Sequence, residues 1–102
     1  MTRLMLEARP AGLTDYSLYV DGALVRMDRR HRGAIICDGG AKHSLLYALH
    51  GEAGGTLGIS LSCAGVEVCR VKGARIGRTG APRAAGRRIF HIRARAPGSG
   101  EP

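Results

Sequence analysis

Three cysteines and four histidines are the residues of this chain that could ligate a metal ion or act as a nucleophile and its base. They are Cys37, Cys63, Cys69, His31, His43, His50 and His91. No two cysteines stand in a C-x-x-C pair, and the spacing from Cys63 to Cys69 is not a usual zinc spacing. A hairpin that turns at Ala64-Gly65 would place these two cysteines on opposite faces of a sheet unless a bulge intervenes. We therefore predict no metal site and no cofactor, and we interpret the cysteines as small buried hydrophobes.

One local arrangement suggests nucleophilic catalysis. If Cys37 and His43 faced each other across a turn at Gly39-Gly40, the imidazole could accept the proton of the thiol. Nothing in the sequence supplies the oxyanion-stabilising donors that such chemistry needs. A core cysteine at a strand end and a surface histidine explain the same residues. A small cysteine-dependent enzyme is therefore only an alternative, and the primary prediction is a protein that is not an enzyme.

The net charge of +8 lies entirely in the last third of the chain. Residues 1–67 hold seven Lys/Arg and seven Asp/Glu, whereas residues 68–102 hold nine Lys/Arg and a single acid, Glu101. Fourteen of the sixteen basic residues are Arg, whose planar guanidinium binds carboxylates and phosphates in a bidentate manner. A chain rich in Gly, Ala and Arg with little Lys is also what GC-rich codons produce. The charge therefore has a compositional explanation beside the functional one.

Residues 73–87 form a Gly/Arg-rich segment without a hydrophobic period, which predicts a basic loop. Its arginines and the next one along the chain are the predicted site for an anionic partner, namely Arg75, Arg78, Arg83, Arg87 and Arg88. Such a segment can dock on an acidic protein face or follow a phosphate backbone. Because it carries no aromatic side chain on which bases could stack, an acidic protein partner is favoured over nucleic acid, which is the alternative.

The elements that must position these residues are short strands. Asp21-Gly22 is a favoured two-residue hairpin turn, and it pairs Val20 with Ala23 and Leu18 with Val25. A second hairpin turns at Ala64-Gly65 and pairs Cys63 with Val66 and Leu61 with Val68. Further strands are expected at residues 3–9, 33–37 and 88–95. Turn residues are expected to end the first strand at 10–12 and to form a loop at 52–55.

The segment 43–50 fits either a buried strand or a short helix that ends at Gly51, and we favour the strand. The sum is six to eight short strands with frequent turns. This pattern predicts an all-β fold, a small antiparallel β-sandwich or barrel built from hairpins. With a helix near 43–50 the fold would instead be α+β. We expect residues 1–96 to form a single domain and residues 97–102 to be a disordered tail.

The start of the chain lacks the long apolar core of a signal peptide, and no apolar run is long enough to cross a membrane. Three cysteines without a signal sequence are typical of reduced thiols, so we expect a cytoplasmic protein without membrane association. The predicted function is a non-catalytic interaction or assembly module. Open sheet edges would also allow homo-oligomers to form by edge pairing.

Overall fold

The computed structural model describes residues 2–38, 42–77 and 83–92, and every regular element in them is a β-strand. The strands are β1 (Thr2–Val20), β2 (Ala23–Leu24), β3 (Arg32–Cys37), β4 (Lys42–Cys63), β5 (Val66–Arg75) and β6 (Arg83–His91). The prediction of an all-β fold is confirmed, as is the strand at 43–50, which forms the first part of β4. Among the described residues there is no helix that could span a membrane.

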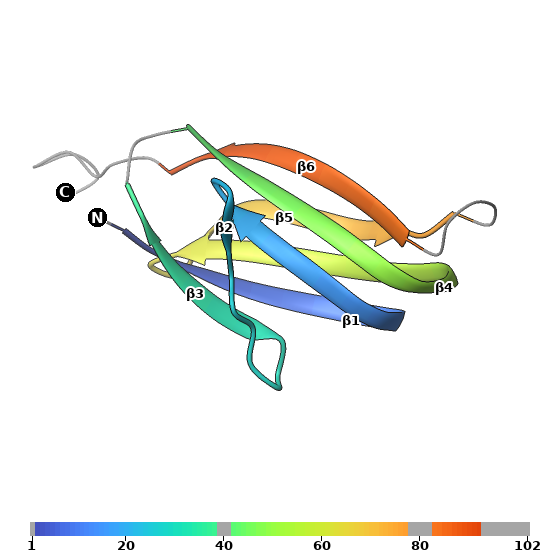
Figure 1. The fold of residues 1–102 in the computed structure, drawn as a ribbon. Coiled ribbons are helices and arrows are strands. Elements are labelled where there is room, and N and C mark those ends of the chain that lie inside the picture. Colours follow the sequence, from blue (N-terminus) through green and yellow to red (C-terminus); the bar gives the residue numbers. More distant parts are fainter. Residues whose placement is uncertain (1, 39–41, 78–82, 93–102) are drawn as a thin grey trace, which may run out of the picture.

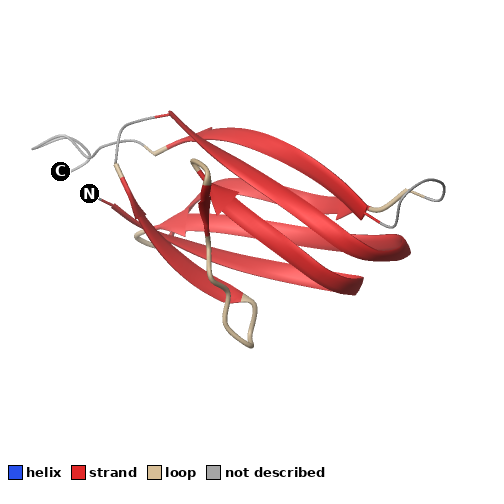
Figure 2. Ribbon diagram, viewed as in Figure 1, coloured by secondary structure: helices blue, strands red, loops and turns tan. Residues whose placement is uncertain are grey.

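Two long strands organise the fold, because β1 and β4 both bend sharply near their middles (Figure 1). Residues 4–11 of β1 pair with residues 56–63 of β4, with β3 and β5 at the outer positions; we call this the first layer. Residues 13–20 of β1 pair with residues 45–51 of β4, with β2 and β6 outside them, and form the second layer. All pairs are antiparallel, and the two layers make a β-sandwich (Figure 2).

Glycine makes the bends possible. A Cβ atom on Gly51 would lie 2.7 Å from the carbonyl oxygen of Gly12, and a Cβ atom on Gly55 would lie 2.7 Å from the same oxygen. The backbones of β1 and β4 therefore approach more closely there than any side chain permits. The expectation that the first strand ends at 10–12 and that 52–55 is a loop is wrong, because the strands bend at these glycines and continue. Pro10 is accommodated because β3 ends opposite Glu7, so no neighbouring strand on that side needs its missing N–H.

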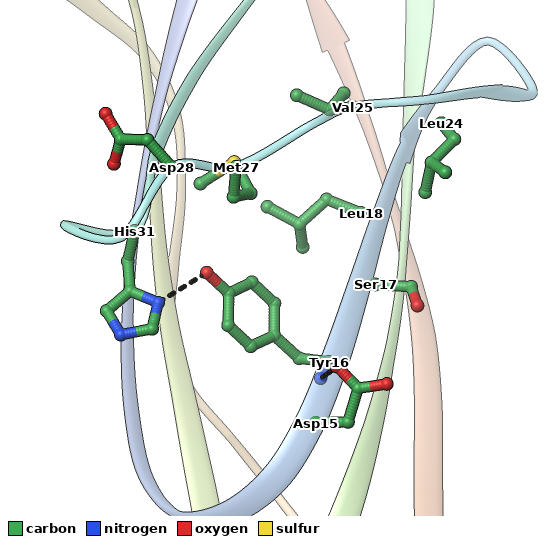
Figure 3. Close-up of a pocket in the computed structure, with 9 residues that line it drawn as sticks. All are labelled: Asp15, Tyr16, Ser17, Leu18, Leu24, Val25, Met27, Asp28 and His31. Carbon is green, nitrogen blue, oxygen red and sulfur yellow. Dashed lines mark hydrogen bonds between the residues drawn. The ribbon is translucent and has the colours of Figure 1, made fainter.

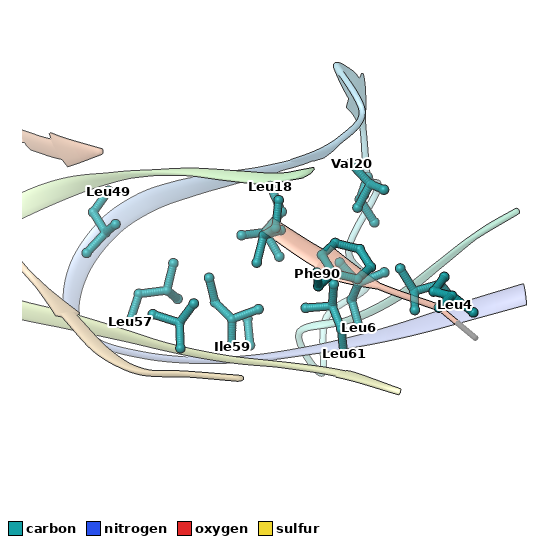
Figure 4. Close-up of a cluster of buried hydrophobic side chains, with 14 of the residues drawn as sticks. Leu4, Leu6, Leu18, Val20, Leu49, Leu57, Ile59, Leu61 and Phe90 are labelled. Atoms are coloured by element: carbon teal, nitrogen blue, oxygen red, sulfur yellow. The ribbon is translucent and has the colours of Figure 1, made fainter. Parts of the chain in front are cut away.

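The hydrophobic core lies between the layers (Figure 4). The first layer contributes Leu4, Leu6, Leu57, Ile59 and Leu61, and the second contributes Leu18, Val20, Leu45, Leu49 and Phe90. Each of these side chains is buried, and they alternate with outward-facing residues along their strands. Burial of each large aliphatic side chain contributes roughly 1.5–3 kcal/mol, so this contact is what holds the two layers together.

Both predicted hairpin turns are present. Asp21 and Gly22 have φ of 51° and 83°, and Ala64 and Gly65 have φ of 50° and 82°. These are the left-handed pairs of a type I′ turn, whose twist matches that of the flanking strands. Val20 pairs with Ala23, and Cys63 pairs with Val66, as the sequence predicts.

Beyond the turns, one predicted register is confirmed and the other is wrong. In the first hairpin β2 ends after Leu24, but the Val25 N–H donates to the Leu18 carbonyl at 2.9 Å, so Leu18 and Val25 pair as predicted. In the second hairpin, a register shift places Cys69 rather than Val68 opposite Leu61. Cys69 therefore shares the core-facing side of the sheet with Cys63, so the prediction of opposite faces is wrong.

The predicted basic loop is mostly strand. Residues 73–75 belong to β5 and residues 83–87 to β6, so at most residues 76–82 connect the two strands. Ile76 is only 1% exposed, and its N–H donates to the Gly55 carbonyl at 2.9 Å while its own carbonyl accepts from the Gly54 N–H at 3.0 Å. These contacts fasten the end of β5 to the bend of β4. Residues 78–82 and the predicted tail at 97–102 lie outside the described residues.

A candidate binding surface along strands β5 and β6

The strands that carry the predicted site arginines lie along one side of the sandwich, but the side chains project from both of its outer faces. The register places Arg75, like Arg70, on the outer face of the first layer, and Arg83 and Arg87 on that of the second. β5 and β6 flank β4 in different layers and contact each other, and Arg75 ends β5 near the point where Arg83 begins β6 (Figure 1). We call this the basic side and define it by Arg70, Lys72, Arg75, Arg83, Arg87 and Arg88. Arg78, also predicted to be part of the site, lies outside the described residues. Arg70 and Lys72 were not predicted, because β5 was interpreted only as a hairpin arm.

Few of these charges are neutralised. Arg70 pairs with Glu67 through an Nε–Oε1 contact of 2.9 Å. Within the described parts of the chain, the other five bases of this side make no ion pair and no side-chain hydrogen bond. On β1 and β3, by contrast, Arg9 and Arg32 both contact Glu7, at 3.0 and 3.4 Å. The basic side therefore presents a local excess of positive charge to solvent.

The pairing with β4 determines where the arginines of β6 lie. Arg83 is opposite His50 and Arg87 is opposite Leu46, so both are on the outer face of the second layer. Arg88 is opposite the buried Leu45 and so lies on the inner face, at the open edge. Burial raises the pKa of the Cys69 thiol, and the nearby positive charge of Arg88 opposes that rise. Arg88 thus lies toward β5, where the two layers meet.

The outer face of the second layer carries a hollow beside Arg83. Its volume is about 480 Å³, and it is lined by Ala48, His50, Arg83, Ala84 and Ala85. Ala48 and Ala85, which pair with each other on the outer face, provide a low apolar floor, whereas Arg83 and His50 provide the polar groups. This combination suits a side chain with an apolar stem and a carboxylate end, which would reach the guanidinium of Arg83.

The second predicted site, Cys37 and His43, has a different geometry from the one that catalysis needs. The Nδ1 atom of His43 lies 2.6 Å from Asp21 Oδ2, and its Nε2 atom lies 2.6 Å from the Asp38 carbonyl oxygen. Both neighbours are acceptors, so the imidazole donates two hydrogen bonds and carries a positive charge. The hydrogen bond that His43 donates to the Asp21 carboxylate raises the pKa of His43, and the same bond, followed by that from the Ser44 N–H, lowers the pKa of Asp21.

His43 therefore fastens three segments together: the β1–β2 turn, the end of β3 and the start of β4. It also packs against Phe90 of β6, with ring centroids 5.6 Å apart. No ring nitrogen is free to accept a proton from Cys37, and burial, followed by the charge of Asp21, raises the pKa of that thiol. The contacts favour a structural role for His43. Asp21 was predicted only as a turn residue, and no local pattern links it to a histidine 22 positions away.

A further pocket, of about 280 Å³, lies between the second half of β1 and the chain that follows β2 (Figure 3). At its rim the Tyr16 hydroxyl is 2.8 Å from the Nδ1 atom of His31. The backbone of His31 is left-handed, with φ of 61°, because the Asp28 carboxylate accepts the N–H groups of Arg30 and Arg32 and tightens the turn. No charged residue of the basic side lines this pocket.

Within residues 2–38, 42–77 and 83–92, no three His, Cys, Asp or Glu side chains are grouped so that they could hold a metal ion. No family model matches the chain, and no curated protein or solved structure matches it either. Any functional inference must therefore come from the chain's own residues.

Proposed function

We propose that the protein is a non-catalytic interaction module whose basic side binds an acidic protein partner. The observation that carries the proposal is the segregation of charge in space. β5 and β6 hold six bases and one acid, whereas the rest of the described chain holds seven bases and six acids. Five of those six bases make no ion pair with another described residue, so they are available for carboxylates from outside.

A protein partner fits this side better than a nucleic acid. Proteins that bind nucleic acids commonly stack bases on exposed aromatic rings or place a helix in a groove. Phe90, the one aromatic residue of β5 and β6, is buried in the core, and the described elements include no helix. Guanidinium groups on a rigid sheet instead suit bidentate contacts with carboxylates.

The test is a binding titration of the full chain with polyglutamate and, separately, with random single-stranded and double-stranded DNA, over a series of salt concentrations. One variant carries Arg83→Gln, Arg87→Gln and Arg88→Gln. The matched control carries Arg26→Gln, Arg29→Gln and Arg30→Gln, which removes the same charge from exposed arginines of the β2–β3 connection. Exposed ion pairs contribute roughly 0.2–1 kcal/mol each, so the loss of three should weaken the affinity of the first variant for polyglutamate by about 3- to 150-fold.

The proposal requires that the control variant keep most of its affinity for polyglutamate. Equal losses in both variants would show that only net charge matters, and the basic side would then not be a site. Tighter binding to DNA than to polyglutamate, lost in the first variant alone, would assign the same arginines to nucleic acid instead.

A further inference from the structure

We infer that the acidic partner binds by strand addition: an extended acidic segment pairs its backbone with the open edge of β6. This inference rests on the proposed function, and it specifies the conformation and the residue spacing of the partner. β6 pairs with β4 through nine consecutive residues, from His91 opposite Lys42 to Arg83 opposite His50, without a register shift. On its other side, β6 has no backbone hydrogen bond to any described residue.

An edge of this kind is a template for another strand. Alternate residues of β6 direct their N–H and C=O groups away from β4, along an edge of roughly 30 Å for nine residues. Natural sheets usually blunt such edges by shortening them or by introducing bulges. The other outer strands are shorter or less regular: β2 has two residues, β3 has six, and β5 has two register shifts against β4. β6 is both long and regular.

Charge selects which strand can be added. β6 carries Arg83, Arg87 and Arg88 and no acidic residue. If two copies of the chain paired along this edge, six arginines would share one strand pair with no acidic residue among them, and like charges close together across a strand pair are destabilising. A strand that carries carboxylates gains a favourable cross-strand pair at the same positions. The arginines therefore act against self-association and in favour of a different, acidic chain.

The positions of the arginines specify a spacing. Arg83 and Arg87 lie four residues apart on the outer face, with Ala85 between them. A residue paired with each would place two carboxylates at positions i and i+4 of the added strand, with a small residue at i+2. The low floor of Ala48 and Ala85 and the hollow beside Arg83 leave room for these side chains. The expected recognition element is thus an extended segment with acids four residues apart.

A peptide experiment tests the backbone pairing separately from the charge. The probe is a capped nine-residue peptide, Glu-Thr-Ala-Thr-Glu-Thr-Ala-Thr-Glu, and its comparator is the same peptide methylated on every backbone nitrogen. Methylation keeps every charge but removes the donors that pairing needs. The protein variants are Arg83→Gln with Arg87→Gln, and as control Arg29→Gln with Arg30→Gln. Affinity is measured by fluorescence anisotropy, and amide hydrogen exchange in β6 is followed by NMR.

Strand addition predicts that methylation weakens binding at least about tenfold, because several hydrogen bonds are lost and each contributes a factor of roughly two to ten. Exchange at alternate amides of β6 should slow when the unmethylated peptide binds. The β6 double variant should bind it more weakly than the control variant does.

Other results would overturn the inference in distinguishable ways. Equal binding of both peptides, with no change in exchange, would refute strand addition and leave the acidic-partner proposal standing. Binding of neither peptide would refute both. Slow exchange in β6 without peptide, together with a dimer in sedimentation, would show that the edge is occupied by a second copy.

Discussion

Replacing Asp21 by Asn should remove the fall in stability that His43 causes as pH rises. In the folded protein the charged imidazole donates to the Asp21 carboxylate and to the Asp38 carbonyl, each at 2.6 Å. Asn can still accept the Ser44 N–H, which lies 2.9 Å from Asp21 Oδ1, and it tolerates the left-handed backbone of this turn. A neutral His43 can keep its bond to Asp38 and accept one from the new amide. The substitution thus removes the charge with little change in shape.

The direction of the pH effect follows from the two pKa shifts. The pKa of His43 is raised above 6.5, so its contribution to stability is complete below that pH and is lost as pH rises through the folded pKa. The pKa of Asp21 is lowered below 3.8, so its contribution is present above that pH and is lost as pH falls through the folded pKa. The pair is therefore at full strength between these two values, and its loss on the alkaline side comes from His43.

The size of the effect follows from the burial of the two partners. The His43 side chain is 5% exposed, whereas that of Asp21 is 46% exposed, so solvent screens the pair in part. A hydrogen bond to a charged group contributes about 1.5–3 kcal/mol and a neutral one about 1 kcal/mol. After discounting for the exposed carboxylate, the wild type should exceed the Asn variant by about 1–2 kcal/mol near pH 6, or about 5–10 °C in Tm.

The assay is urea unfolding followed by circular dichroism from about pH 5.5 to 8.5, at constant ionic strength and with a reductant; thiols of the unfolded chain ionise at the top of this range, and they do so in every variant alike. Glu52→Gln, an exposed acid at the bend, is the control for net charge. The unfolding free energy of the wild type and of the control should fall toward high pH more steeply than that of the Asp21→Asn variant. Parallel pH profiles for wild type and Asp21→Asn would refute the charged hydrogen bond between His43 and Asp21 as a source of stability.

Three other substitutions or reactions test the fold. Gly51→Ala should lower the free energy of unfolding by roughly 2–4 kcal/mol, because the new Cβ would lie 2.7 Å from the backbone oxygen of Gly12. The control is Gly58→Ala, whose closest contact would be 3.6 Å and which should be nearly neutral. Both are measured by denaturant unfolding. Ile76→Ala should lower the free energy of unfolding by roughly 2–4 kcal/mol in the same assay, since the side chain is 1% exposed. A loss no larger than the roughly 0.5 kcal/mol of a surface substitution would show that Ile76 does not fasten the end of β5. Cys37, whose pKa is raised by burial, should react with iodoacetamide at least about tenfold more slowly in the native chain than in urea, and equal rates would contradict its half-buried placement.

The all-β fold and its turns could be predicted because they depend on local rules. Asp21-Gly22 and Ala64-Gly65 supply the two left-handed residues of a type I′ turn from within the turn itself. The apolar alternation around each turn then defines a core face. Nothing beyond a few neighbouring residues was needed for these predictions.

The failures occur where a residue's role depends on a distant segment. Gly12 and Gly51 mark loops when considered alone, but they meet across 39 positions and let two strands bend without stopping. Residues 83–87 have poor strand propensity, and they are strand because nine residues of β6 pair with β4. In both cases the tertiary pairing overrides the local preference.

The candidate site illustrates the same division. The excess of arginine in the last third is visible in the sequence, but its arrangement is not, because the predicted loop would have left those side chains without fixed positions. The structure places three of the five predicted arginines on one strand, Arg83, Arg87 and Arg88 of β6. That regular strand also provides the backbone groups that make strand addition a specific hypothesis.

The bends of β1 and β4 connect the fold to the proposed function. Because β4 bends, its two halves carry β5 and β6 in different layers but on the same side of the sandwich. A charge asymmetry along the sequence thereby becomes a charge asymmetry in space. If β4 ran straight, the two basic strands would lie at successive positions along one extended sheet and would present two separate, weaker patches. The glycines of the bend carry no charge themselves. They nevertheless bring the two basic strands together, next to the one long, regular open edge among the described strands.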